Sequence, residues 1–212
     1  MPHFSQDDIN KLEHLYKINL INSCSGFKSA NLIGTKSSNG ISNVAIFSSV
    51  THIGSNPALL GFFLRPTTVI RNTYDNIKET VFFTINHINE TIMEDAHHTS
   101  AKYNSNVSEF DVTNLEEIYK NNFFAPFVNG SPVQMAMKYV EEYPIQANGT
   151  ILIIAEILDL YLEDYLLESD GFVNLSKANT VAINGLDGYA LPKLKTRLEY
   201  QRPKKISEIK PK

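Results

Sequence analysis

Two Asn-Gly pairs, Asn39-Gly40 and Asn148-Gly149, each lie between two strand-like segments, and no other feature constrains the fold of this chain as strongly. Asparagine and glycine tolerate the positive φ angles that a tight β-hairpin turn needs. The flanking segments are 30–35 and 42–50 around the first pair, and 133–139 and 150–161 around the second. The sequence therefore predicts a fold built on antiparallel hairpins.

Two more strands and several helices are expected elsewhere in the chain. Residues 58–64 and 81–88 are apolar segments of strand length. Helices are expected where a capping residue precedes apolar residues at helical spacing. These helices span about 5–16, 72–80 and 89–101, with another starting at Thr113.

Strands outnumber helices in this pattern, and closing a sheet into a barrel removes its exposed edges. We therefore expect a mainly β fold with peripheral helices, in which residues 1–212 form one domain. The barrel core would occupy about 30–165, followed by an irregular C-terminal segment over 171–212. A chain of 212 residues with 42% hydrophobic residues can bury a sizeable core.

Composition excludes several classes of protein. The longest apolar run, residues 151–155, is far shorter than the roughly 20 residues that a membrane helix needs. Residues 1–8 are polar and acidic, unlike a signal peptide, so a cytoplasmic location is expected. The single cysteine, Cys24, cannot form an internal disulfide, and we expect a small semi-buried residue there.

The charge is unevenly distributed. From Lys193 onward, eight basic and two acidic residues give +6, whereas the rest of the chain carries −10. A basic tail can bind nucleic acid or an anionic ligand, but more often it is simply solvated. Because this tail lacks the arginine and aromatic density of a nucleic-acid platform, neither a nucleic-acid nor a membrane partner is expected.

Most familiar catalytic motifs are missing from the sequence. There is no G-x-G-x-x-G, no phosphate-binding P-loop, no H-E-x-x-H, no G-x-S-x-G and no Cys/His cluster. Glu94 and His97 have the spacing of a di-iron half-site, but only one copy is present. We therefore expect no metal site, no separate dinucleotide-binding domain and no catalytic acid or base. Of the adjacent His97 and His98, one could line a pocket.

The most informative stretch runs from Asn43 to Thr73. A strand leads into the polar segment 48–52, and strand ends can present backbone groups and short hydroxyls to a flat heterocycle. Arg65, Arg71 and a helix start at Asn72 follow, and both arginine and a helix N-terminus favour a phosphate. Spacing alone favours an ordinary strand end and an ordinary helix start with a surface arginine over a ligand site.

An ordered set of short motifs resembles the flavin-reductase-like family. The family patterns are N-x-A-x-F-S, an apolar P-x-L-L-x-F strand, R-D-T-x-x-N-I, F-x-I-N, S-E-F, G-L-D-x-Y and Y-x-R-P. They match residues 43–48, 56–62, 71–77, 83–86, 108–110, 185–189 and 200–203, with Asn72 in place of the usual acidic residue. The similarity covers about residues 30–203.

This resemblance implies an FMN-binding split β-barrel, usually a homodimer with the flavin near the subunit interface. One face of the long strands 133–139 and 150–161 could pack across such an interface. The resemblance and the polar stretch together suggest which residues bind the cofactor. The expected set is Ser48, Ser49, Val50, Thr51, His52, Arg65, Arg71, Asn72, Thr73 and Asn86, with His98 on the substrate side.

The expected reaction is hydride transfer from NAD(P)H to FMN, which needs no acid–base residue. Some family members supply reduced flavin to a monooxygenase, so such an acceptor is one partner to expect. Two alternatives stay open: a flavoredoxin-like FMN electron carrier without NAD(P)H turnover, and a non-flavin ligand-binding barrel. The sequence holds no nicotinamide fingerprint, so it does not distinguish NADH from NADPH as the donor. It also leaves open whether FMN is a tightly bound cofactor or an exchanged substrate.

Overall fold

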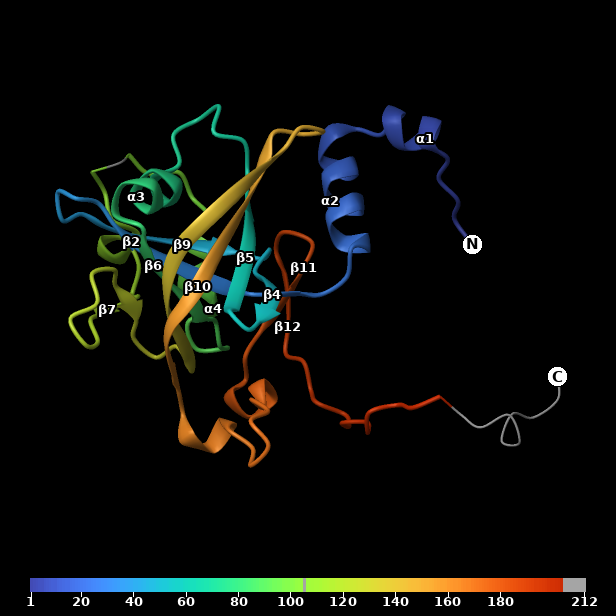
Figure 1. The fold of residues 1–212 in the computed structure, drawn as a ribbon. Helices are drawn as coiled ribbons and strands as arrows, with labels where there is room; N and C mark the ends of the chain where they lie inside the picture. Colours follow the sequence, from blue (N-terminus) through green and yellow to red (C-terminus); the bar gives the residue numbers. More distant parts are fainter. Residues whose placement is uncertain (105, 204–212) are drawn as a thin grey trace.

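The computed structural model describes residues 1–104 and 106–203. Its main element is a seven-stranded antiparallel sheet with the strand order β3-β2-β6-β9-β10-β5-β4, curled around an apolar interior (Figure 1). Since β3 and β4 end this order, the barrel is open between them. The strands are β2 (Asn31–Lys36), β3 (Ser42–Phe47), β4 (Thr51–Ser55), β5 (Ala58–Leu64), β6 (Phe82–His87), β9 (Val133–Ile145) and β10 (Thr150–Leu162).

Smaller elements surround this barrel. A three-stranded sheet contains β1 (Lys28–Ser29), β11 (Ala182–Asn184) and β12 (Gly188–Ala190), and a two-stranded sheet contains β7 (Glu117–Ile118) and β8 (Phe127–Val128). The α-helices are α1 (Gln6–Lys11), α2 (His14–Cys24), α3 (Asn72–Thr80) and α4 (Met93–His98). Three 3₁₀ helices are η1 (Glu109–Asp111), η2 (Asp164–Leu166) and η3 (Leu175–Ala178).

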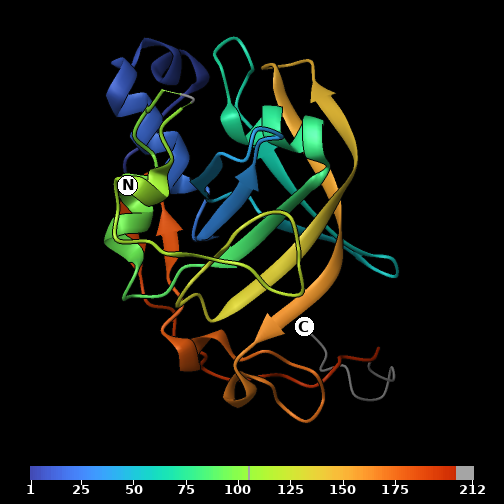
Figure 2. The same cartoon turned by 90° about the vertical axis from the view of Figure 1, so that its left-hand side faces the viewer.

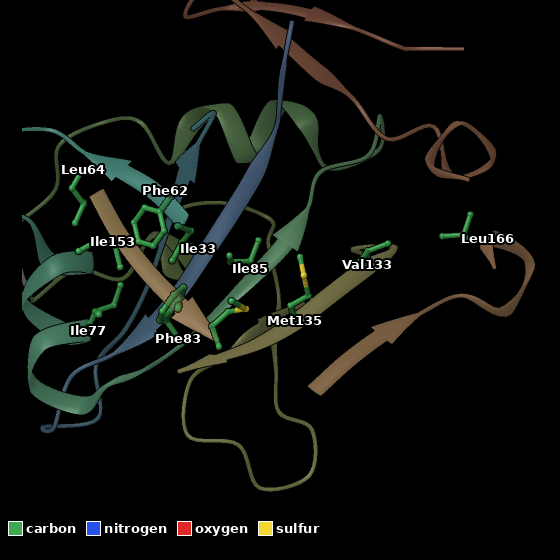
Figure 3. Close-up of a cluster of buried hydrophobic side chains, with 12 residues drawn as sticks. Ile33, Phe62, Leu64, Ile77, Phe83, Ile85, Val133, Met135, Ile153 and Leu166 are labelled. Atoms are coloured by element: carbon green, nitrogen blue, oxygen red, sulfur yellow. The ribbon is translucent and has the colours of Figure 1, made fainter. Parts of the chain in front are cut away.

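The barrel interior is the main core. Phe62 packs edge-on against Phe47 and Phe83, with ring centroids 5.2 and 5.7 Å apart. Phe62, Phe83 and Ile33 belong to one buried cluster (Figure 3). Ile77 of α3 closes the same core from outside the sheet. A second cluster covers the other face of β2 and β3 and includes residues of α4, β8 and β11. Strand β2 is therefore covered on both faces.

Both expected hairpins and the expected mainly β architecture are confirmed. The helix expected at 72–80 and the strand expected at 58–64 have the predicted bounds. The strand expected over 42–50 ends at Phe47, because the chain turns at 48–50 and returns as β4. The described part of the C-terminal segment, residues 171–203, is more ordered than expected, since it contributes β11 and β12 to a sheet with β1. Residues 204–212 of that prediction lie outside the described residues.

The single helix expected over 5–16 is wrong, because two helices occupy this region. Ser5 forms the expected capping box with Asp8 at the start of α1. Glu13 then caps a second helix, since its carboxylate accepts the backbone N–H groups of Leu15 and Tyr16 at 2.9 and 3.1 Å. Figure 2 shows the two blue N-terminal helices at one side of the barrel, outside its strands.

Two further helix expectations and one burial expectation are corrected. No helix starts at Thr113 in the described part of the chain, because its hydroxyl donates to the Glu109 carbonyl at 2.7 Å and holds a turn before β7. The helix expected over 89–101 is limited to α4. Cys24 is exposed at the end of α2 rather than semi-buried.

Candidate functional site

The polar segment after β3 lies against strand β5. The Ser49 hydroxyl donates to the Phe63 carbonyl at 3.1 Å and accepts the Phe63 N–H at 3.0 Å. Val50 packs on the barrel core, and its carbonyl accepts a hydrogen bond from Ser29 at 3.2 Å. The end of β3 is thus tied to β5 and β1, while Ser48 beside it is only half-buried.

Thr51 and His52 lie on β4, the last strand of the sheet, and both are exposed. The His52 Nε2 atom is 3.1 Å from the Ser55 hydroxyl on the same strand. Arg65 follows the end of β5 two residues after Phe63, and it is exposed. Because a strand rises about 3.3 Å per residue, Arg65 lies close to the backbone that Ser49 contacts.

The start of α3 is fixed to the barrel from two directions. The Asn43 amide of β3 donates to the hydroxyl of buried Thr73 at 3.2 Å, and the Asn76 amide donates to the Thr35 hydroxyl of β2 at 3.0 Å. Both asparagines are buried. The first turn of α3 therefore has a set position. Sequence reasoning placed both residues in the motif set but did not predict the Asn43–Thr73 contact.

The start of α3 also offers unused hydrogen-bond donors. Arg71 occupies the N-cap position, and among the described residues no side chain caps the helix. The Nε atom of Arg71 is buried and has no hydrogen-bond partner in the described structure. A buried donor without a partner is costly, and a helix N-terminus attracts negative charge. Together, these donors suit an anion such as a phosphate, with Asn72 in the first helical turn beside them.

Asn86 does not face this region, contrary to the sequence-based expectation. Its side chain is fully buried, and the amide donates to the Leu32 carbonyl at 3.2 Å and the Thr84 hydroxyl at 2.8 Å. Its Oδ1 atom accepts the Val128 N–H at 3.1 Å. Asn86 of β6 therefore connects its own strand with β2 and β8 through hydrogen bonds. Its role is structural, which was the alternative for a polar residue at a strand end.

The two histidines of α4 have different surroundings. His98 is exposed, lies 2.6 Å from the Tyr103 hydroxyl, and lines an open hollow of about 480 Å³ with Glu94, Asp95 and residues 111–114. None of the residues 48–73 lines this hollow. The Nδ1 atom of His97 lies 2.9 Å from the Tyr189 hydroxyl. Burial, and to a smaller extent the negative charge of Asp187, raises the Tyr189 pKa to about 12. His98 is therefore not grouped with the polar strand end.

Glu109 is a buried carboxylate that sequence reasoning did not single out. One of its oxygens accepts the Val44 N–H of β3 at 3.1 Å. Burial raises the Glu109 pKa above its usual value of 4.5, although hydrogen bonds from the Glu109 and Val44 N–H groups partly oppose this. The S-E-F motif was the one sequence pattern that contained this glutamate. In the structure, its carboxylate binds the backbone of β3.

We expect Glu109→Gln to change how stability depends on pH. A raised folded-state pKa means that wild-type stability falls as pH rises from about 4.5 through that pKa, by at most about 1.4 kcal/mol per pH unit. Glutamine keeps an acceptor for Val44 but never ionises, so the variant should gain stability relative to wild type as pH increases. Urea unfolding at pH 4.5 and 7.5 measures this, with the exposed Glu94→Gln as control. If the unfolding free energy of Glu109→Gln differs from that of wild type by the same amount at both pH values, the raised Glu109 pKa is contradicted.

These features define a class of protein: a split β-barrel with a polar segment after β3 and, among the described residues, an uncapped start of α3 beside a buried Arg71 Nε atom without a partner. The chain belongs to the flavin reductase-like domain family, whose sequence pattern matches residues 26–176. Family membership assigns it a flavin-related function. No described helix is long and apolar enough to span a membrane.

Solved structures agree with this family. A flavin reductase-type split-barrel protein from Shewanella frigidimarina NCIMB 400 shares 46% identity with a TM-score of 0.92, over 95% of this chain and all of that one. Nitrilotriacetate monooxygenase component B from Bacillus cereus shares 17% identity and a TM-score of 0.81, over 93% and 98% of the two chains. Flavoredoxin of Desulfovibrio vulgaris (Miyazaki F) shares 20% identity and a TM-score of 0.70, over 82% and 91%.

Proposed function

We propose that this protein binds FMN and catalyses its reduction by NAD(P)H. The observation that carries the proposal is the donor set at the start of α3, where the buried Arg71 Nε atom lacks a partner in the described structure. In a flavin reductase-like chain, the phosphate of FMN is the anion that fits such donors. FAD and riboflavin, in contrast, offer no terminal phosphate monoester.

Each part of the proposed site has a separate task. Arg71, with the backbone N–H groups of Asn72 and Thr73, would hold the phosphate dianion, and the exposed Arg65 would add a second positive charge. Ser48, Ser49 and Val50 would present backbone groups and hydroxyls to the isoalloxazine ring and the ribityl chain, and Thr51 and His52 would extend this surface along β4. The Ser49–Phe63 hydrogen bonds set the distance between the strand end and β5.

FMN, when bound, supplies the acceptor for the hydride of a reduced nicotinamide. The residues of this chain need only bind and orient, which agrees with the lack of an acid–base pair along 48–73. No dinucleotide-binding motif is present in the sequence, so the nicotinamide would approach the exposed β4 side directly. We propose further that the protein is a homodimer and that reduced flavin passes to an acceptor such as a monooxygenase. The likeness to a monooxygenase component B supports that acceptor class only through the fold.

We expect purified protein mixed with FMN to show altered flavin absorbance and fluorescence, and to bind FMN more tightly than riboflavin. The reason is the phosphate contact proposed for Arg71. Isothermal titration and fluorescence quenching measure both affinities. If FMN gives no signal at high micromolar concentration, the flavin proposal fails and the non-flavin ligand-binding barrel replaces it.

The reaction is tested by anaerobic stopped-flow mixing of FMN-loaded protein with NADH or NADPH. We expect flavin absorbance to bleach within seconds with at least one of the two nucleotides, and the faster one identifies the donor. If neither bleaches the flavin over many minutes while dithionite does, the protein is a flavoredoxin-like electron carrier instead.

A further inference from the structure

Four buried polar residues join helix α3 to the barrel, and they form two matched pairs. Thr35 of β2 and Asn43 of β3 are directly opposite in the strand register, so both side chains lie on the same face of the sheet. Thr73 and Asn76 are three residues apart on α3, which places them on one face of the helix. All four residues are buried. The start of α3 is thus held by a polar network, in addition to the apolar contact of Ile77 with the core (Figure 3).

The two hydrogen bonds of this network run in opposite directions. The Asn76 amide on the helix donates to the Thr35 hydroxyl on the sheet at 3.0 Å. The Asn43 amide on the sheet donates to the Thr73 hydroxyl on the helix at 3.2 Å. An amide nitrogen donates only, whereas a hydroxyl has one hydrogen to donate and two lone pairs that accept. The Thr73 oxygen therefore accepts from Asn43, and its own hydrogen stays available for another acceptor.

Within the described part of the chain, the Thr73 hydroxyl donates no hydrogen bond of its own. A threonine inside a helix can donate to the carbonyl four residues earlier, and Thr80 of α3 does so to the Asn76 carbonyl at 2.8 Å. Thr73 is only the second residue of the helix, so no helical turn precedes it. Its hydroxyl therefore adds a further donor to the uncapped helix start and the buried Arg71 Nε atom.

We infer that Asn43 is a positioning residue for the anion that binds at the start of α3. By donating to the Thr73 oxygen, the Asn43 amide leaves the Thr73 hydroxyl to act as a donor towards a ligand. Such a donor suits a group that only accepts, and the dianion of a phosphate monoester presents three acceptor oxygens. Asn43 acts only through Thr73. The inference rests on the proposed function in one respect, because FMN is the phosphate monoester proposed there.

The first test measures FMN and riboflavin affinities of full-chain variants by calorimetric titration. Thr73→Val keeps the side-chain shape without the hydroxyl, and it should weaken FMN at least about tenfold, as for one hydrogen bond to a charged group. Asn43→Ala should weaken FMN by roughly two- to tenfold, as for one neutral hydrogen bond. In the Thr73→Val background, Asn43→Ala should cause no further loss. Riboflavin affinity should stay unchanged throughout. A full additional loss in the double variant, or equal losses for both ligands, overturns the inference.

Asn76→Ala is the matched control for Asn43→Ala. It also removes one buried amide–hydroxyl hydrogen bond between α3 and the sheet, but this bond does not involve Thr73. The two variants should lose similar stability in urea unfolding, while only Asn43→Ala loses FMN affinity. If both variants weaken FMN equally, Asn43 merely holds the helix in place, and the positioning role is overturned.

Asn43→Asp provides a pH profile that a purely structural role would not produce. An ionised carboxylate only accepts, so it would take the Thr73 hydroxyl hydrogen and add a negative charge near the phosphate. A protonated carboxyl group can donate again. FMN affinity relative to wild type should therefore be lowest at pH 8 and recover as the pH falls to 5. Dividing by the wild-type value removes the titration of the phosphate itself, whose second pKa is about 6. A ratio that stays constant with pH contradicts the inference.

Inorganic phosphate separates this inference from the flavin proposal, and it also decides the question if a variant fails to fold. In nitrogen-15 NMR spectra of wild type, added phosphate should shift the side-chain amide signal of Asn43, because its acceptor hydroxyl becomes polarised. The side-chain amide signal of Asn76 should hardly move. If phosphate shifts the Asn43 signal but FMN does not bind, the proposed function fails and the positioning role stands. If phosphate binds without shifting this signal, or if neither phosphate nor FMN binds, the inference is overturned.

Discussion

Replacing Arg71 with alanine is expected to weaken FMN binding by about 1.5–3 kcal/mol, the range for a lost charge-assisted hydrogen bond. This corresponds to a loss of affinity of roughly 10- to 150-fold. The guanidinium stands at the N-cap of α3, and its buried Nε atom has no other partner in the described structure. Calorimetric titration with FMN measures the effect directly.

Riboflavin provides the internal control for this variant, since it lacks the phosphate. Its affinity should hardly change in Arg71→Ala, whereas equal losses for both ligands would mean that Arg71 does not contact the phosphate. Lys102→Ala removes the same unit of charge from an exposed position in another loop. It should leave FMN affinity unchanged, and a matching loss there would attribute the effect to overall charge.

Replacing Phe62 with alanine is expected to lower the free energy of unfolding by about 3–5 kcal/mol. The side chain is 1% exposed at the centre of the barrel, and its ring packs edge-on against both Phe47 and Phe83. The variant would therefore lose apolar burial and two aromatic contacts, and it would leave a cavity in the core. Urea unfolding followed by circular dichroism measures the change.

Phe124→Ala is the matched control for Phe62→Ala, because it makes the same chemical change at a residue that is 41% exposed. Its cost should be below about 1 kcal/mol, as for most surface substitutions. Similar losses for the two variants would show that the barrel interior is not the principal source of stability.

The elements that sequence reasoning placed best are those with local causes. The turns at Asn39-Gly40 and Asn148-Gly149 depend on residues within the turn, and α3 begins and ends where local patterns indicated. The break between α1 and α2 was missed because Glu13 caps a helix without belonging to the usual capping residues. The turn at Thr113 was missed because its hydroxyl bonds backward to Glu109, which competes with helix formation.

For the site, sequence reasoning named segments rather than the partners of individual side chains. Ser49 after β3 and Arg71 at the start of α3 are both half-buried, and their contact with a ligand stays a prediction. Asn86 could not be assigned from sequence, since its partners Leu32 and Val128 are distant in the chain. The Asn43–Thr73 contact was hidden for the same reason. Only the folded arrangement distinguishes an amide facing a ligand from one joining strands.

The contact between Glu109 and Val44 has a consequence for the open edge of this fold. β3 ends the strand order of an open barrel, and such a strand exposes backbone donors that can pair with a strand from another molecule. The Glu109 carboxylate accepts a hydrogen bond from the Val44 N–H. When it is ionised, its negative charge also disfavours an incoming strand. A loop side chain thereby occupies a backbone donor of this edge strand that an incoming strand would otherwise pair with.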